Sequence, residues 1–118
     1  MDYIDLTGLK FTATHGCLDT ERTTPQPFLV DARIYLDLKP AGTSDDLSKT
    51  VNYADVYDDI KAIVCGEPKN LIESIGEEIA ATLLKKYPLE KVKIIVHKPK
   101  APINGEFTDI SVTIKRSK

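Results

Sequence analysis

Alternating hydrophobic and polar positions predict four β-strands in this chain. Apolar residues take every second position over Tyr3–Ala13, Phe28–Leu38, Lys91–Lys98 and Thr108–Lys115, a period of two that is typical of strands with one buried face. In the first segment the alternation changes phase at Gly8, so we expect a β-bulge there. The regular pattern of the second segment favours an antiparallel strand with one side in solvent.

A helical period replaces the alternation in the middle of the chain. Apolar residues three or four apart predict helices over Tyr53–Val64 and Leu71–Lys86, with Asn52 and Asn70 as their N-caps. The order is therefore ββααββ, which predicts an α+β domain over residues 1–118, with a four-stranded antiparallel sheet and both helices on one face. Nothing obviously blocks the sheet edges, so we expect pairing with further copies of the chain in a homo-oligomer.

Composition excludes several classes of function. The chain has 118 residues, 42% hydrophobic and 29% charged, with a formal net charge of −2, as expected of one globular domain. No basic cluster indicates nucleic-acid binding, and no apolar run is long enough to cross a membrane. The first residues lack the positive region of a signal peptide. The two cysteines have no CxxC spacing, so we expect reduced thiols and a cytoplasmic protein.

The metal-binding residues of the chain show no recognisable pattern. The only histidines are His15 and His97, and they belong to no HExxH motif. A catalytic zinc site usually takes three protein ligands, so a carboxylate would have to complete a site built from these two. We therefore expect no metal and no other cofactor.

Lys98 is the most unusual position in the sequence. It shares one face of its predicted strand with Val92, Ile94 and Val96, so an otherwise apolar side ends in an ammonium. Pro99 follows and should end the strand, because proline has no N–H to donate. Two interpretations follow. Either the lysine extends its head back to water, or the ammonium is partly desolvated and suited to proton transfer.

Three more positions have both a functional and a structural interpretation. Glu21 lies in a long segment without periodicity, residues 14–27, and such loops are often functional, although the side chain could simply be solvated. Tyr53 opens the first helix, where it could begin the apolar stripe. Glu73 lies in the first turn of the second helix and could form a capping box with Asn70.

Four short motifs, in one order along the chain, resemble the dihydroneopterin aldolase family. They are His15-Gly16-x-x-x-x-Glu21, Thr50-Val51-Asn52-Tyr53, Asn70-Leu71-Ile72-Glu73 and the run from Val96 to Ile103. The resemblance covers essentially the whole chain. It implies the tunnelling fold, with rings of four subunits, two of them stacked into an octamer.

The resemblance also implies how a pterin substrate is held. Glu73 would accept the paired N–H donors of the pterin ring, in the manner of an arginine–carboxylate fork. The backbone N–H of Ile72, at a helix N-terminus, would meet the pterin carbonyl oxygen. Val51 and Tyr53 would reach the site from the neighbouring subunit, so that active sites lie between subunits.

The implied reaction is a retro-aldol cleavage in folate biosynthesis, a lyase activity. It converts 7,8-dihydroneopterin into 6-hydroxymethyl-7,8-dihydropterin and glycolaldehyde. The C=N bond of the dihydropterin can take the electrons released when the carbon–carbon bond breaks. Neither a lysine Schiff base nor a metal is then required. Lys98 and Glu21 would form the acid–base pair, and Tyr53 would return a proton to carbon or relay it.

Two other functions fit the same residues. Retro-aldol cleavage followed by re-addition with inverted geometry would give an epimerase of dihydroneopterin or of its triphosphate. A non-catalytic ring protein that binds pterins would keep the fold and the pterin contacts without turnover, since fold alone does not guarantee activity.

Overall fold

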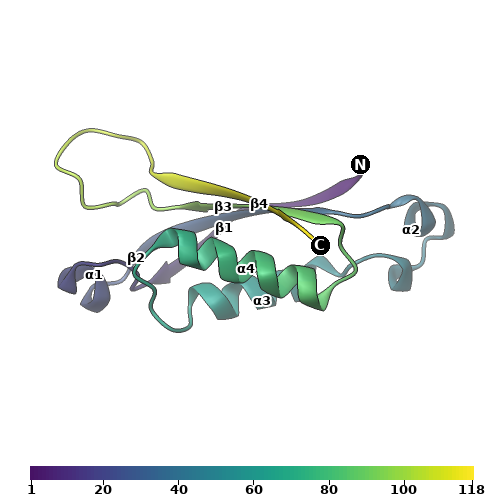
Figure 1. Ribbon diagram of the computed structural model, residues 1–118, viewed down its shortest axis with the longest axis horizontal. Helices are drawn as coiled ribbons and strands as arrows, with labels where there is room; N and C mark the ends of the chain where they lie inside the picture. Colours follow the sequence, from purple (N-terminus) through teal and green to yellow (C-terminus); the bar gives the residue numbers. More distant parts are fainter.

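The structure, a computed structural model, describes residues 1–118 and confirms the predicted α+β framework with three short helices added (Figure 1). The elements are β1 (Tyr3–Ala13), α1 (Asp19–Thr23), β2 (Gln26–Tyr35), α2 (Lys39–Ser44), the 3-10 helix η1 (Leu47–Lys49), α3 (Tyr53–Val64), α4 (Ile72–Lys86), β3 (Lys91–His97) and β4 (Ser111–Ser117). None of the helices is long and apolar enough to cross a membrane.

The four strands form one antiparallel sheet in the order β1-β2-β3-β4. Helices α3 and α4 lie together on one face of it, with α4 against β3 and β4 and α3 against β1 (Figure 1). The core fills the space between these two layers. The side chains that alternate inward are almost fully buried, as the sequence pattern predicts: Phe28, Val30, Ala32 and Ile34 from β2, Val92, Ile94 and Val96 from β3, and Ile75, Ile79 and Leu83 from α4.

The bulge predicted in β1 is confirmed. The register with β2 shifts between Leu6 and Leu9, and Gly8 adopts a φ of +68°, a conformation that glycine takes without steric cost. The freed N–H of Gly8 donates to Asp31 Oδ1 at 2.7 Å. The bulge therefore restores the inward alternation of β1. It also gives the Asp31 carboxylate, on the face away from the helices, a backbone hydrogen-bond donor.

Strand boundaries differ from the prediction where pairing, rather than hydrophobicity, decides them. β2 ends at Tyr35, the partner of Lys91 at the start of β3, whereas the alternation predicted an end at Leu38. β4 begins at Ser111, opposite His97, not at Thr108. Since ladder hydrogen bonds define a strand, apolar residues beyond the last partner continue the pattern without continuing the sheet.

Helix α4 begins one residue later than predicted. Its N-cap is Leu71, which makes no side-chain cap bond, so the prediction of Asn70 as cap is wrong. Asn52 is confirmed as the cap of α3, since its side chain accepts from the N–H of Ala54 at 3.0 Å. Asn70 is instead used in the loop before α4, where its side chain accepts a hydrogen bond from Arg22.

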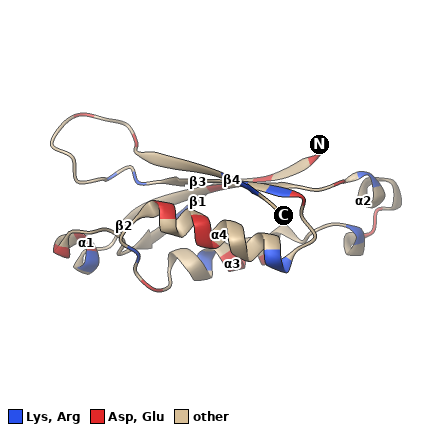
Figure 2. Ribbon diagram, in the orientation of Figure 1, with Lys and Arg blue, Asp and Glu red and all other residues tan.

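Helix α4 is held tightly against the sheet at one position. A Cβ built on Gly76 would lie 2.7 Å from Cδ1 of Ile114, so any larger residue would displace the end of that side chain. Acidic residues lie near the start of α4, and Lys85 and Lys86 lie in its last turn (Figure 2). The helix dipole stabilises charges placed in this way. The close approach at Gly76 thus lets α4 pack against both β3 and β4.

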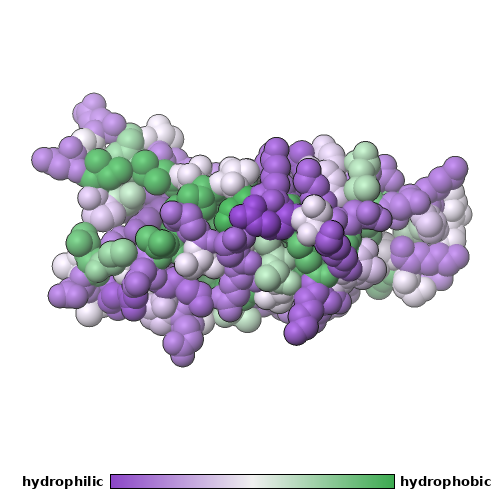
Figure 3. All heavy atoms as spheres, viewed as in Figure 1, coloured by the Kyte–Doolittle hydropathy of each residue, from purple (hydrophilic) through white to green (hydrophobic).

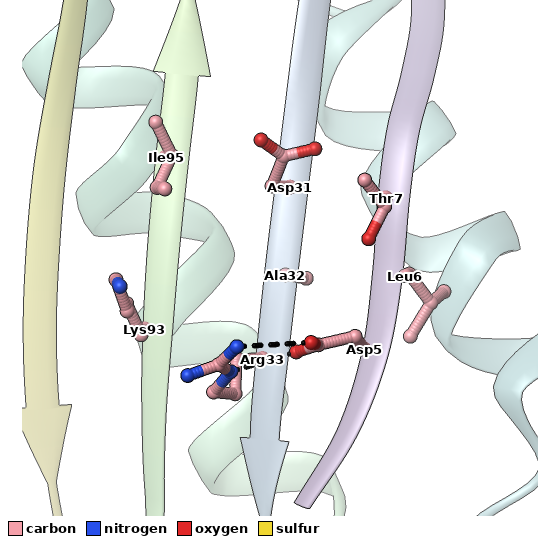
Figure 4. Close-up of a pocket in the computed structure, with 8 residues that line it drawn as sticks. All are labelled: Asp5, Leu6, Thr7, Asp31, Ala32, Arg33, Lys93 and Ile95. Carbon is pink, nitrogen blue, oxygen red and sulfur yellow. Dashed lines mark hydrogen bonds and ion pairs between the residues drawn. The ribbon is translucent and has the colours of Figure 1, made fainter.

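The other face of the sheet is not covered by helices and carries charged side chains (Figure 4). Arg33 on β2 pairs with Asp5 on β1, with Nε 2.8 Å from Oδ1. Asp31 and Lys93 project from the same face, while the helices lie behind the sheet in this view. Polar residues on the outward half of the alternation therefore remain outside the core.

Candidate active site

Lys98 follows the last residue of β3, and its side chain turns to the helix-covered side of the sheet. Its Nζ lies 2.5 Å from Oε2 of Glu21, and the two side chains are only 13% and 7% exposed. An ion pair this far from solvent is weakly screened. The interpretation of Lys98 as a residue that reaches back to water is therefore wrong, because its ammonium meets a carboxylate inside the protein.

Glu21 is positioned by α1, the short helix that the sequence pattern did not predict. Its carboxylate accepts from the N–H of Leu18 at 3.4 Å and from Nε2 of Gln26 at 3.3 Å. Burial acts to raise the pKa of Glu21, but the hydrogen bond from Lys98 and the bond from Leu18 outweigh it and hold that pKa below its ordinary value. The carboxyl is thus an ionised, buried acceptor, and the interpretation of Glu21 as a solvated residue is wrong.

His15 anchors the loop that carries Glu21. Its ring is 1% exposed; Nε2 lies 2.6 Å from the carbonyl of Val64, and Nδ1 accepts from the N–H of Lys69 at 2.9 Å. The proton must therefore be on Nε2, because Nδ1 faces a donor. Burial lowers the pKa of His15, which keeps the ring neutral. Both nitrogens are used to hold the loop against the α3–α4 connection.

Gly16 makes room for the Glu21 carboxyl. Its φ of +143° suits glycine, and a Cβ built there would lie 2.3 Å from Cδ of Glu21. Its N–H donates to the carbonyl of Lys69 at 2.9 Å, and its carbonyl accepts from Nε of Arg22 at 2.8 Å. This close packing fixes where the carboxylate lies.

The first turn of α4 adjoins the same loop. The bond between Arg22 and Asn70 ties the residues after Glu21 to the residue before Leu71, the helix N-cap. Glu73 lies in this turn with an exposed carboxylate that takes part in none of the hydrogen bonds or ion pairs of the chain. The capping-box interpretation of Glu73 is therefore wrong, and the carboxylate is free to accept donors from a ligand.

The backbone N–H of Ile72 is a second polar group beside Glu73. Its side chain is 8% exposed and belongs to the core, so the first turn of α4 is held in place by packing. The first N–H groups of a helix have no acceptor within the helix. A carboxylate and free backbone donors thus lie together at the start of α4.

Tyr53 and Val51 lie at the opposite end of α3 from the loop that carries Glu21. Val64, the last residue of α3, contacts His15, and the rise of about 1.5 Å per residue places Tyr53 about 16 Å away along the helix. Tyr53 is 65% exposed and Val51 is 4% exposed, so Tyr53 does not start the apolar stripe of α3 as the structural interpretation held. One chain brings together Lys98, Glu21, Ile72 and Glu73 but not Tyr53 or Val51.

Sequence reasoning missed the polar pocket beside the Lys98–Glu21 pair. Its lining includes Thr20, Thr24 and Gln26 from the α1 region and Lys100 and Pro102 from the loop after β3. Oε1 of Gln26 is buried there without a partner. Nothing in the local sequence singles out Gln26, because the pocket forms only when two distant loops meet.

Comparison with known proteins gives one consistent result. The family model for dihydroneopterin aldolase matches residues 4–115. A dihydroneopterin aldolase of Streptomyces coelicolor is 48% identical over 118 residues, covering 100% of this chain and 99% of that protein. One of Bacillus subtilis is 40% identical over 119 residues, with 100% and 99% covered.

A solved structure agrees over the whole length. The crystal structure of E. coli dihydroneopterin aldolase in complex with neopterin superimposes with a TM-score of 0.91 at 30% identity, covering 99% of this chain and 100% of that one. Sequence, family model and fold therefore agree, and the chain belongs to the dihydroneopterin aldolase family.

Proposed function

We propose that Lys98 and Glu21 are the acid–base pair with which this chain, a lyase of the dihydroneopterin aldolase family, cleaves 7,8-dihydroneopterin. The observation that supports this is the buried 2.5 Å contact between the two side chains. It lies next to a helix N-terminus that presents the unpaired carboxylate of Glu73. A proton donor, a proton acceptor and a ligand-binding carboxylate thus lie at one end of the fold.

Glu73 and Ile72 are proposed to hold the pterin ring. The ring amide and the exocyclic amine present two parallel N–H donors, which one carboxylate accepts as a bidentate pair. The N–H of Ile72 is proposed to donate to the ring carbonyl at the positive end of the helix dipole. The E. coli relative, crystallised in complex with neopterin, supports a ligand of this class.

The proposed chemistry needs only proton transfers from the protein. Loss of the side-chain hydroxyl proton lets the carbon–carbon bond break, which releases glycolaldehyde, while the bond electrons move into the ring C=N and its nitrogen takes up a proton. Lys98 is suited to supply that proton, and the ionised Glu21 is suited to take the proton that the hydroxyl loses. Tyr53 is proposed to deliver a proton to the resulting enamine carbon, or to relay it from the protonated Glu21, and the ring nitrogen returns its proton to Lys98, which gives 6-hydroxymethyl-7,8-dihydropterin.

The exposed side chain of Tyr53 is proposed to enter the site from a neighbouring subunit of a ring, together with the backbone of Val51, whose side chain is buried in its own chain. Large apolar side chains are exposed toward both ends of α3. Leu71 directly precedes Ile72 and Ile103 lies in the loop that follows Lys98, whereas Leu47 lies in η1, shortly before Tyr53. Figure 3 shows such side chains gathered on the long β3–β4 loop. Exposed apolar groups of this kind commonly mark contact sites. Rings of four subunits, stacked into an octamer, would join the two ends.

A cytoplasmic location is also part of the proposal. Cys17 and Cys65 are both free and exposed. Unpaired thiols are the usual state of cysteine in a reducing compartment, which is where we propose the chain acts.

The test separates binding from turnover. Lys98→Ala should lower kcat on dihydroneopterin by about 100-fold to 10,000-fold, the usual contribution of a positioned acid–base group, while neopterin still binds. Glu73→Ala should instead weaken neopterin binding by at least tenfold, since a charged hydrogen-bond partner contributes about 1.5–3 kcal/mol. Titration calorimetry gives the affinities, and released glycolaldehyde gives the rates.

Lys85→Ala, in the last turn of α4, is the matched control and should change neither quantity. Full turnover by Lys98→Ala would contradict the acid–base assignment. Chromatography of the pterin products would detect the side-chain epimer if cleavage is followed by re-addition. Trapping of a lysine adduct with borohydride would show Schiff-base chemistry instead.

A further inference from the structure

His97, the last residue of β3, lies between two carboxylates. Its Nε2 is 2.8 Å from Oδ2 of Asp31 on β2, and its Nδ1 is 2.6 Å from Oδ2 of Asp109, just before β4. All three side chains are between 24% and 31% exposed. The other oxygen of Asp31 is held by the N–H of Gly8 in the β1 bulge. A polar bridge therefore crosses the uncovered face of the sheet directly behind Lys98.

Both contacts require a doubly protonated ring. A neutral imidazole has one N–H, so it can donate to only one carboxylate and would present a lone pair to the other. The imidazolium has two N–H donors and adds charge assistance to both bonds. The bridge is therefore complete only while His97 carries its proton.

The bridge closes the base of the long β3–β4 loop. Asp109 and Ile110 end this loop, and the N–H of Lys98 donates to the carbonyl of Ile110 at 2.7 Å. The same loop provides Lys100 and Pro102 to the pocket beside Glu21. His97 and Lys98 are adjacent, so their side chains point to opposite faces of the sheet. Holding His97 in place holds the backbone from which Lys98 reaches Glu21.

We infer that His97 is a positioning residue for Lys98, and that the Asp31–His97–Asp109 bridge is a clamp that opens when His97 loses its proton. The inference rests on the proposed role of Lys98. The clamp would make turnover depend on a group that never touches the substrate. Misplacing a reacting group by about 1 Å can cost 100-fold in rate, so a loose β3 end should lower kcat more than it lowers pterin affinity.

The surroundings of His97 set the direction of the pH effect. Directly across the strand pairs it faces Leu29 on β2 and Ser111 on β4, which carry no charge. Burial acts to lower the pKa of His97, but the bonds to Asp109 and Asp31 outweigh burial and raise it. The other charged residues on this face are Asp5, Lys10, Arg33, Lys91, Lys93 and Lys115.

A raised pKa in the folded state means that the clamp is complete below the ordinary histidine pKa of about 6.5 and is lost as pH rises through the folded-state pKa. Loss of the clamp therefore lowers kcat as the pH rises. His97→Gln, which has a single amide in place of two ring donors, should lower kcat by about 10-fold to 100-fold and remove that contribution from the pH profile. Its affinity for neopterin should remain close to that of the unmodified chain.

Asp109→Asn distinguishes a clamp from a merely stabilising ion pair. The amide can donate to the unprotonated Nδ1 of neutral His97, so the bridge should persist at alkaline pH. The kcat of Asp109→Asn should then exceed that of the unmodified chain at high pH, whereas Asp109→Ala should resemble His97→Gln. Asp5→Asn, which breaks the neighbouring pair with Arg33, is the matched control and should keep the unmodified pH profile.

Two measurements test for the clamp without measuring enzyme turnover. Nitrogen-15 spectra of the imidazole should show both His97 nitrogens protonated at neutral pH, and amide exchange at Lys98 should accelerate in His97→Gln. A singly protonated ring, or full kcat with an unchanged pH profile in His97→Gln, would overturn the inference. If the unmodified chain releases no glycolaldehyde, the proposed function fails instead, and the spectra and exchange rates still decide whether the clamp exists.

Discussion

At the scale of single residues, the placement of the Glu21 carboxyl depends on a neighbour that has no side chain. Gly16 →Ala would put a methyl group 2.3 Å from Cδ of Glu21 and strain a backbone with φ of +143°. The carboxyl would have to move away from Lys98. We expect kcat to fall by about 10-fold to 100-fold and the free energy of unfolding to fall by about 1–3 kcal/mol. Glycolaldehyde release and urea unfolding measure the two effects.

Gly42→Ala is the matched control for this change. Gly42 lies in α2 with no atom within 4 Å of a built Cβ, and alanine favours the helix. We expect an unchanged kcat and a gain of about 0.4–1 kcal/mol in stability. An unchanged kcat in Gly16→Ala would show that turnover tolerates a displaced Glu21.

Some residues of the site could be predicted from the sequence, whereas their partners could not. Lys98 was identifiable because strand alternation places it on the apolar face with Val96. Its pairing with Glu21 followed only from a family resemblance, since no local pattern relates the end of β3 to a helix of five residues. The contacts of His97 were not predicted at all, because its partners Asp31 and Asp109 come from other segments.

At the scale of elements, the two asparagines that precede α3 and α4 should behave differently. Asn52 caps α3 through Ala54, so Asn52→Ala should cost about 1 kcal/mol of stability. Asn70 does not cap α4; it holds Arg22 in the loop that carries Glu21. Asn70→Ala should therefore lower kcat while the amides of α4 keep their protection against hydrogen exchange.

Urea unfolding, glycolaldehyde release and amide exchange distinguish these outcomes. Loss of protection in the first turn of α4 upon Asn70→Ala would contradict the observed cap at Leu71. It would indicate that Asn70 caps the helix in solution.

The elements that sequence predicted well are those whose periodicity extends over many residues. The bounds of β1 and α3 agree with the prediction. A long alternation or a long helical stripe allows few other positions for the ends of the element. The helices α1 and α2 were missed, since they are five and six residues long and show no periodic stripe. Strand ends were misplaced where the partner strand ends first, which hydrophobicity alone does not reveal.

At the scale of the whole molecule, the proposed catalytic groups lie toward opposite ends of α3 in an elongated chain. The principal extents are 52 × 26 × 22 Å, with Lys98 and Glu21 at one end and Tyr53 at the start of α3. Strands β1 and β4 form the two edges of the sheet, and unpaired edges favour addition of further strands. A site shared between subunits would join the two ends.

Mixing two inactive variants tests this arrangement. Lys98→Ala keeps Tyr53, and Tyr53→Phe keeps Lys98. Each variant alone should be impaired. If they are denatured together and refolded, random assembly should rebuild native sites at roughly one quarter of the interfaces, since each interface draws one residue from each neighbour. Glycolaldehyde release should then recover to about one quarter of the unmodified rate.

The control for mixing is a pair of variants on the same end of the chain. Lys98→Ala and Glu21→Ala change residues that contact each other within one subunit, so no mixed interface contains both native side chains and no recovery is expected. Recovery in the first mixture but not in the second would require that Tyr53 acts on the Lys98 of another copy. A site that Tyr53 completes across the interface predicts recovery in the first mixture only. Equal recovery in both mixtures, or none in either, would contradict it.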